Sequence, residues 1–134
     1  MATMNEFTFP SCDGVHEIYV RQWLPEGPVR AVVQIAHGVA EHIARYDDFM
    51  QFLTEQGIAV VGNDHLGHGR STRSADELGY FGAEKGWNHV VGDIHRLHRK
   101  IKGEYPDVPV FLFGHSMGSF LSRTYAILNG EDLD

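Results

Sequence analysis

The 134-residue sequence predicts an α/β fold, in which a mostly parallel sheet is covered by helices on both faces and preceded by an N-terminal antiparallel hairpin. Two observations support this fold class. Nearly continuous apolar runs at 31–36, 58–62 and 110–113 have the pattern of strands that are buried on both faces. Segments with helical periodicity follow these runs, and such alternation favours parallel pairing through right-handed crossovers.

The N-terminal hairpin is predicted from two β-prone segments. Phe7–Phe9 and Glu17–Leu24 carry alternating or β-branched residues, and the turn-rich patch Ser11–Gly14 separates them. The segment Pro25–Pro28 then breaks the chain, so we expect the sheet to continue with the apolar strand Ala31–Ala36.

Three helices are expected from the apolar spacing. The segment Tyr46–Gln56 has an amphipathic pattern that places Phe49, Met50 and Phe52 in the core as packing residues. The longest helix is predicted over Trp87–Tyr105 and the last over Ser119–Asn129, whereas residues 63–82 have the composition of a long loop with one short helical turn.

The sequence GHSMG at 114–118 follows the third apolar run directly and has the G-x-S-x-G pattern of a nucleophile elbow. In such a strand–turn–helix, Gly114 and Gly118 lie where a Cβ would collide with neighbouring backbone. Ser116 is therefore predicted to be a catalytic nucleophile, with His115 as a packed neighbour. The alternative is a glycine-rich turn whose serine only caps a helix.

An acyl-transfer site also needs donors for the oxyanion. In the elbow geometry one donor is the backbone N–H after the serine, here that of Met117. The loop HGVAEH at 37–42 follows the first apolar strand, and its Gly38 allows a close turn that presents the N–H of Val39 as the second donor. The alternative is an ordinary turn at the end of a strand.

Taken together, HGVAEH at 37–42, NDHLGHGRS at 63–71 and GHSMG at 114–118 resemble the monoacylglycerol lipase and lysophospholipase branch of the α/β-hydrolase superfamily. The resemblance covers most of the chain, from the third strand to its end. It implies an α/β-hydrolase fold, a serine esterase that acts on monoacylglycerols, lysophospholipids or related esters, and no cofactor. It also implies Ser116 as nucleophile with Val39 and Met117 as oxyanion donors.

Two kinds of alternative stay open beside this resemblance. Another chemistry of the same fold, that of a carboxylesterase, a peptidase or an acyltransferase, would use the same elbow. A non-catalytic binding module would keep the scaffold without turnover.

Nine histidines raise the question of a metal site. Asp64, His65 and His68 lie close together, but the glycines between them indicate a turn, so we expect these side chains to hydrogen-bond loop backbone. His95 and His98 are spaced i, i+3 on a helix without a third ligand, and we expect them to be solvated. We therefore predict no metal.

A serine nucleophile requires a histidine base and an orienting acid, which in this fold follow the serine in the order acid, then histidine. After Ser116 there is no histidine, and the acids are Glu131, Asp132 and Asp134. We therefore expect residues 1–134 to be the N-terminal portion of a single α/β-hydrolase domain, completed by the remainder of the hydrolase chain. The cap, the C-terminal strands, the acid and the base would lie in that remainder, and this portion alone would be unstable or inactive.

The absence of a histidine after Ser116 has two alternative interpretations. The chain could be a naturally short, non-catalytic relative, or His37, His65 or His68 could supply the base. Both alternatives leave the last strand as an open apolar edge, which is an aggregation hazard.

Composition narrows the partners. The net charge of −7 and the lack of a basic stripe argue against nucleic acid. The single cysteine, Cys12, suits a reducing compartment, and neither a signal peptide nor a membrane span is recognisable, so we expect a cytoplasmic protein. A lipid substrate allows peripheral membrane contact, although no basic amphipathic helix favours it.

Overall fold

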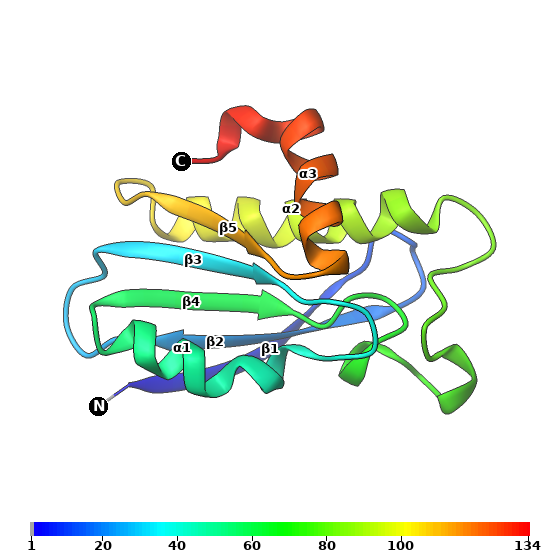
Figure 1. The fold of residues 1–134 in the computed structure, drawn as a ribbon, viewed down its shortest axis with the longest axis horizontal. Helices are drawn as coiled ribbons and strands as arrows, with labels where there is room; N and C mark the ends of the chain where they lie inside the picture. Colours follow the sequence, from blue (N-terminus) through cyan, green and yellow to red (C-terminus); the bar gives the residue numbers. More distant parts are fainter. Residues whose placement is uncertain (1) are drawn as a thin grey trace.

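A five-stranded sheet forms the centre of the part of the chain that the structure describes, residues 2–134 of a computed structural model. Its order is β1-β2-β4-β3-β5 (Figure 1). The strands are β1 (Thr3–Pro10), β2 (Glu17–Leu24), β3 (Ala31–Ala36), β4 (Ile58–Asn63) and β5 (Val110–Gly114). The predicted hairpin is present as β1 and β2, and β1 is longer than expected because all eight of its residues pair with β2.

The sheet combines two pairing modes. Strand β2 is antiparallel to both β1 and β4, whereas β3 is parallel to β4 and to β5. The three apolar runs of the sequence therefore form the parallel part, as predicted, and their carboxyl ends meet at one edge of the sheet.

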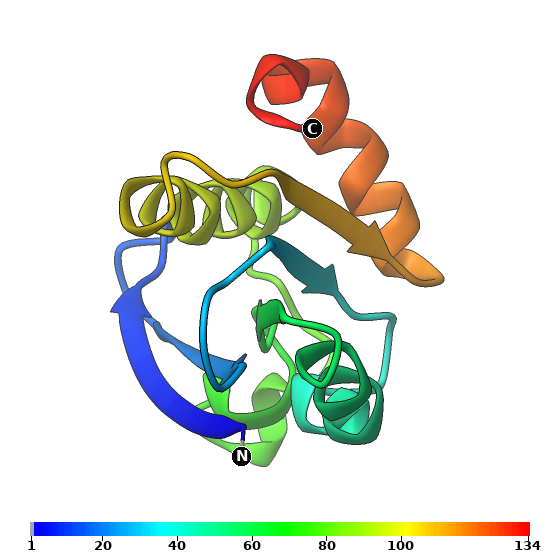
Figure 2. The same ribbon diagram turned by 90° about the vertical axis from the view of Figure 1, so that its left-hand side faces the viewer.

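Helices cover both faces of the sheet (Figure 2). Helix α1 (Asp47–Thr54) packs on one face, where its fully buried Met50 contacts a cluster that includes Ile35 and Val60. Helices α2 (Gly86–Glu104) and α3 (Met117–Asn129) lie on the other face. Full burial of one such side chain contributes about 1.5–3 kcal/mol, so each layer is stabilised chiefly by its apolar face.

Several boundaries differ from the sequence-based expectation. Helix α1 is preceded by the 3₁₀ turn Ile43–Tyr46, and the loop after β4 contains two such turns, at Gly69–Ser71 and Ala75–Glu77. Helix α3 begins at Met117, so the predicted segment Ser119–Asn129 continues the helix that starts at the elbow, and a fourth 3₁₀ turn, Gly130–Asp132, follows it.

The prediction that Phe49 and Phe52 lie in the core was wrong, since 37% and 56% of these side chains are exposed. Met50 and Leu53 take the inward positions of α1, which leaves the two aromatic residues on its flank. The ring of Phe49 instead lies 5.6 Å from that of Phe113 on β5.

Strand β5 lies at the edge of the described sheet and exposes apolar surface. Phe111 and Phe113 are each 43% exposed, while the alternate residue Val110 is buried toward α2. At the start of this edge the backbone N–H of Asp134 donates to the carbonyl oxygen of Val110 at 3.2 Å. The expected open apolar edge is therefore present in the described chain.

Within residues 2–134, no helix combines the length and the apolar character that crossing a membrane would require.

Candidate active site

The turn between β5 and α3 places Ser116 in a strained conformation. Its backbone has φ 56° and ψ −122°, a region that residues with a Cβ rarely adopt. The residue is exposed, and helix α3 begins directly after it. Strain of this kind is the geometry that the G-x-S-x-G pattern predicts, in which the serine hydroxyl is presented above the sheet.

The two glycines of the elbow allow its close packing. A Cβ on Gly118 would overlap the carbonyl oxygen of Ala36 at the end of β3. A Cβ on Gly114 would overlap the carbonyl oxygen of Gly118 and lie 2.5 Å from Oγ of Ser122. The elbow therefore packs against β3 and α3 only with glycine at both positions.

The helix after the elbow gives the serine an electropositive environment. Helix α3 has 13 residues and its N-cap is Ser116, so the positive end of the helix dipole lies at the serine. A negative charge that develops beside Ser116 would be stabilised there, by the dipole and by the backbone N–H groups of the first turn.

The loop after β3 touches the elbow. A Cβ on Gly38 would lie 3.0 Å from Cβ of Ser116, and the N–H of His115 donates to the carbonyl oxygen of Ala36 at 3.2 Å. The next residue, Val39, is 61% exposed. Gly38 and Ser116 therefore lie close together, and the residue after each of them, Val39 and Met117, is one of the two predicted oxyanion donors.

Glu41 joins the loop to the elbow, a role that the sequence did not reveal. Its Oε2 accepts from the backbone N–H of Gly38 at 2.7 Å and from the hydroxyl of Tyr46 at 3.1 Å, and it lies 3.2 Å from Nδ1 of His115. The carboxylate is almost fully buried, with 6% of the side chain exposed. One acceptor atom therefore connects the 37–42 loop, Tyr46 at the start of α1 and His115, the residue before Ser116.

The electrostatics favour a charged Glu41. Burial alone raises the pKa of this carboxyl, but the hydrogen bonds from Gly38, His115 and Tyr46 outweigh it and hold the pKa below its usual range. Burial and the neighbouring carboxylate raise the pKa of Tyr46 to about 12, so its hydroxyl stays protonated and donates.

His115 was expected to be a packed neighbour, and this expectation was wrong. The side chain is 63% exposed, because the sharp turn directs it outward beside Tyr46, whose hydroxyl lies 3.3 Å from Nδ1.

Asp64 organises the turn after β4. One carboxylate oxygen accepts from the N–H of Ile43 at 2.7 Å and the other from the N–H of Arg70 at 2.8 Å. Asp64 therefore fixes the 63–71 loop against the segment that follows the 37–42 loop, through backbone groups as predicted.

His37 and His65 are also engaged with backbone. Nδ1 of His37 donates to the carbonyl oxygen of Gly38 at 2.7 Å, and its Nε2 accepts from the N–H of His65 at 3.1 Å. Nε2 of His65 donates to the carbonyl oxygen of His37 at 3.0 Å, and both rings are fully buried. Both nitrogens of His37 and Nε2 of His65 are thus engaged within the protein, and Nδ1 of His65 is buried without a partner. The full burial of both rings argues against either histidine as the base of Ser116.

Burial keeps these rings neutral. It lowers the pKa of His37 to about 4 and, with help from His37, lowers that of His65 well below its usual range. Among residues 2–134 there is no group of three or more histidine, cysteine or carboxylate side chains arranged to hold a metal ion.

The expectation that His95 and His98 are solvated was wrong for His98, which is fully buried. Its Nδ1 lies 2.9 Å from Oε1 of Gln34, a polar residue inside the apolar strand β3, and its Nε2 lies 3.0 Å from the carbonyl oxygen of Asp132. The unusual glutamine in a buried strand is the sequence signal that called for a polar partner. His95 lies against the hydroxyl of Tyr125 at 3.1 Å.

Two cavities adjoin the 37–42 loop. One, of about 490 Å³, lies between the 39–42 loop, the 67–69 turn and the segment that carries Leu78 and Gly79. The other, of about 320 Å³, is lined by Glu41, Arg45, Tyr46, Phe49, Phe113 and His115. Both are large enough for part of an organic substrate.

The sheet order, the strained serine and the adjoining loop define an α/β-hydrolase. Residues 27–134 match the sequence model of the family described as serine aminopeptidase S33, and the chain belongs to this family.

Individual relatives agree with this assignment. The chain is 41% identical over 105 residues to a monoglyceride lipase homolog of Monkeypox virus, covering 78% of this chain and 36% of the relative. It is 35% identical over 112 residues to monoglyceride lipase of Rattus norvegicus, covering 84% of this chain and 35% of the relative. The chain therefore spans about a third of the length of these relatives.

A solved structure gives the same fold. The highly thermostable carboxyl esterase of Bacillus coagulans superposes with a TM-score of 0.90 at 34% identity, over 98% of this chain and 42% of the esterase.

Proposed function

We propose that this chain is the nucleophile-bearing portion of a serine hydrolase that cleaves carboxylic esters of single-chain acyl lipids, either monoacylglycerols or lysophospholipids. The observation that carries the proposal is the strained, exposed Ser116 at the N-terminus of α3, in contact with the loop that contains Val39. The similarity to monoglyceride lipases supports the substrate class.

In the proposed reaction, Oγ of Ser116 attacks the ester carbonyl carbon while a histidine outside these 134 residues takes its proton. The backbone N–H groups of Val39 and Met117 stabilise the oxyanion, and each such donor is worth about 3 kcal/mol. The tetrahedral intermediate collapses as the same histidine gives the proton to the leaving alcohol oxygen, and water then hydrolyses the acyl-enzyme and releases the fatty acid. Gly38, Gly114, Gly118 and Asp64 hold the geometry, and no metal or cofactor takes part.

We also propose that residues 1–134 are the N-terminal portion of one α/β-hydrolase domain. The exposed Phe111 and Phe113 on β5 support this, as does the backbone bond from Asp134 to Val110, which brings the chain back to the open edge. The remainder of the hydrolase chain would then cover β5 and supply the cap, the acid and the base.

The substrate class is tested by hydrolysis assays on the full-length protein. Kinetic constants are measured for 1-monooleoylglycerol, lysophosphatidylcholine, a short p-nitrophenyl ester and an amino-acid p-nitroanilide. The proposal expects the highest kcat/KM for one of the two lipids, unchanged by a chelator. Preference for the anilide would instead support a peptidase, which is the activity in the family's description, and preference for the short ester would support a carboxylesterase.

We propose that the protein is located in the cytoplasm. Cys12 is a free thiol, which favours a reducing, cytoplasmic environment. A lipid substrate brings the protein to a membrane surface at least transiently, and co-sedimentation of the full-length protein with vesicles of phosphatidylcholine and monooleoylglycerol measures that contact.

A further inference from the structure

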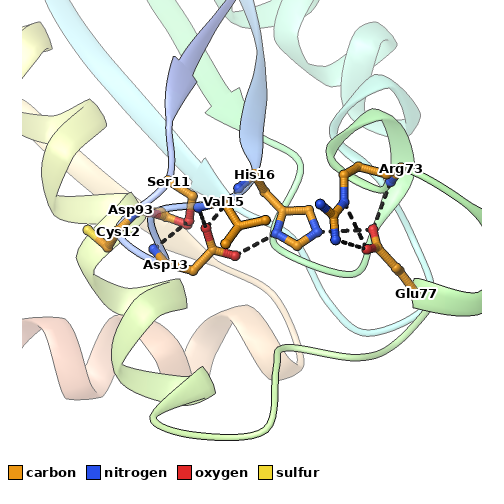
Figure 3. Close-up of polar contacts among 8 residues, drawn as sticks. All are labelled: Ser11, Cys12, Asp13, Val15, His16, Arg73, Glu77 and Asp93. Carbon is orange, nitrogen blue, oxygen red and sulfur yellow. Dashed lines mark hydrogen bonds and ion pairs between the residues drawn. The ribbon is translucent and has the colours of Figure 1, made fainter.

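The turn of the β1–β2 hairpin is anchored on helix α2 (Figure 3). Oγ of Ser11 donates to Oδ2 of Asp93 at 2.8 Å, and the N–H of Cys12 donates to Oδ1 at 2.7 Å. Asp93 is fully buried in the middle of α2, and Arg96 adds a bond to the carbonyl oxygen of Pro10 at 2.8 Å. The turn is therefore a fixed point of the fold.

From this fixed turn, His16 reaches to another loop. Figure 3 shows its imidazole between two carboxylates: Nδ1 lies 2.5 Å from Oδ2 of Asp13 and Nε2 lies 3.0 Å from Oε1 of Glu77. The three side chains are largely shielded, with 17%, 13% and 20% of their surface exposed. A histidine that bridges two carboxylates must donate from both nitrogens, so the bridge is complete only when the ring is protonated.

Glu77 in turn closes its own segment. Its carboxylate accepts from the backbone N–H of Arg73 at 2.8 Å and from the guanidinium of the same residue at 3.0 and 2.8 Å. Two residues later the N–H of Gly79 donates to the carbonyl oxygen of Gly67 at 2.7 Å. Glu77 thus connects the hairpin turn to a compact loop, residues 73–79, that is joined to the 67–69 turn.

This loop forms one wall of the 490 Å³ cavity. Leu78, the residue after Glu77, is 62% exposed and lines the cavity together with Val39, which is 61% exposed. A displacement of Glu77 is transmitted through one peptide unit to Leu78. The width of the cavity beside the predicted oxyanion donor therefore depends on where Glu77 is held.

We propose that His16 is a positioning residue, whose imidazolium clamps Glu77 to Asp13 and thereby holds Leu78 as the wall of the cavity beside Val39. This inference rests on the proposed function, in which the cavity receives part of the lipid substrate. A clamped wall binds the acyl part or the alcohol part of the ester more tightly than a mobile wall, because less of the protein has to become ordered on binding.

The surrounding charges favour the protonated ring. Burial lowers the pKa of His16, but the hydrogen bonds to Asp13 and Glu77 outweigh it and raise the pKa above its usual range. Three other charged groups belong to the same cluster: Arg73, bound to Glu77, and Asp93 and Arg96 on α2. Because the pKa in the folded protein is raised, the clamp is complete at low pH and is lost as the pH rises through that value.

The test uses the full-length protein and its E77Q variant, with D76N as the matched control. Asp76 lies beside Glu77 in the same 3₁₀ turn and is not part of the bridge. Two quantities are followed from pH 5.5 to 9 by NMR: the ring protons of His16 and the methyl groups of Leu78. Affinity for 1-O-decylglycerol, an ether analogue of a monoacylglycerol that cannot be hydrolysed, is measured over the same range.

In the wild type and in D76N, the Leu78 methyl shifts should titrate with His16, and affinity should weaken about fivefold above that pKa. In E77Q the pKa of His16 should fall, Leu78 should no longer follow it, and affinity should be weak at every pH. If Leu78 does not respond to the titration of His16 in the wild type, the proposal is overturned. If Leu78 follows His16 but the ether does not bind at any pH, the clamp stands and the proposed substrate is wrong.

Discussion

The two edges of the sheet are stabilised in opposite ways. At the β1–β2 edge, polar side chains satisfy one another: Arg21 pairs with Asp47 and Glu6, and Glu6 also pairs with Arg70. At the β5 edge, Phe111 and Phe113 are exposed, and the ring of Phe113 lies against that of Phe49. The hairpin edge is therefore held by ion pairs, whereas the β5 edge, which leads directly into Ser116, exposes apolar side chains.

The predicted chemistry and the open edge thus lie on the same side of the sheet. Ser116 follows the edge strand directly, so whatever covers β5 also lies near the serine. The hairpin is connected to the cavity only indirectly, through the bond from His16 to Glu77, the residue before Leu78. The expected effects of substitutions and of pH on activity and stability therefore range from very large at the elbow to small at the buried histidines.

The largest effect is expected at the elbow. Replacing Ser116 with alanine in the full-length protein should lower kcat for monooleoylglycerol by about 10⁴-fold or more, because the acyl-enzyme can no longer form. The matched control S119A alters a serine one turn further along α3 and should keep kcat within about twofold, as expected for a side chain outside the reaction. Comparable activity of S116A and S119A would refute the nucleophile.

A charge at the open edge should distinguish a covered strand from a bare one. In the full-length protein, F113D should reduce the free energy of unfolding by about 3 kcal/mol, because the remainder of the chain would bury an unpaired carboxylate. The control M4D alters a residue of β1 that is 37% exposed and should cost about 0.5 kcal/mol or less. Chemical denaturation measures both, and equal small effects would show that nothing covers β5.

The contact between the 37–42 loop and the turn at Ser116 should respond to the loss of the charge on Glu41. In E41Q the acceptor of Gly38, Tyr46 and His115 is weakened, so kcat should fall about tenfold while KM changes little, as for donors that act mainly in the transition state. D48N, on the exposed side of α1, serves as the control. An unchanged kcat in a folded E41Q protein would show that Glu41 does not position the donors.

Acid should weaken the core of the site. The pKa of His37 is depressed to about 4, so the unfolded chain binds more protons than the folded one between about pH 6.5 and 4. The free energy of unfolding should therefore fall with decreasing pH, by up to about 1.4 kcal/mol per pH unit for this histidine. Denaturation between pH 6.5 and 5, above the titration of most carboxylates, measures this slope.

The histidine of the hairpin side has the opposite sign. Because the pKa of His16 is raised, the contribution of His16 to the free energy of unfolding is present at low pH and is lost above that pKa. For the buried histidines, a free energy of unfolding that stays constant between pH 6.5 and 5 would contradict the neutral state of His37 and His65.

Much of the site could be predicted because it depends on short-range rules. The elbow needs glycine at 114 and 118 within one turn, and parallel strands place the ends of β3 and β5 at the same edge. The meeting of the 37–42 loop with Ser116 therefore follows from the sequence pattern and the handedness of crossovers.

The contacts that the sequence did not reveal join loops far apart in the chain. Glu41 and His115 are 74 positions apart, and His16 and Glu77 are 61 apart. Their pairing depends on loop conformations that no periodic pattern encodes. Likewise, the burial of His98 depends on its facing Gln34 across the α2–β3 interface, which amphipathic spacing alone does not specify.

The central claim is that Ser116 is an activated nucleophile, and covalent labelling tests it most directly. The full-length protein, its S116A variant and its S119A variant are treated with an alkyl fluorophosphonate, and peptide mass spectrometry locates the adduct. We predict stoichiometric labelling of Ser116 in the wild type and in S119A, and none in S116A. A folded full-length protein that remains unlabelled, or that is labelled at another residue, would contradict this claim and favour a binding module built on a hydrolase scaffold.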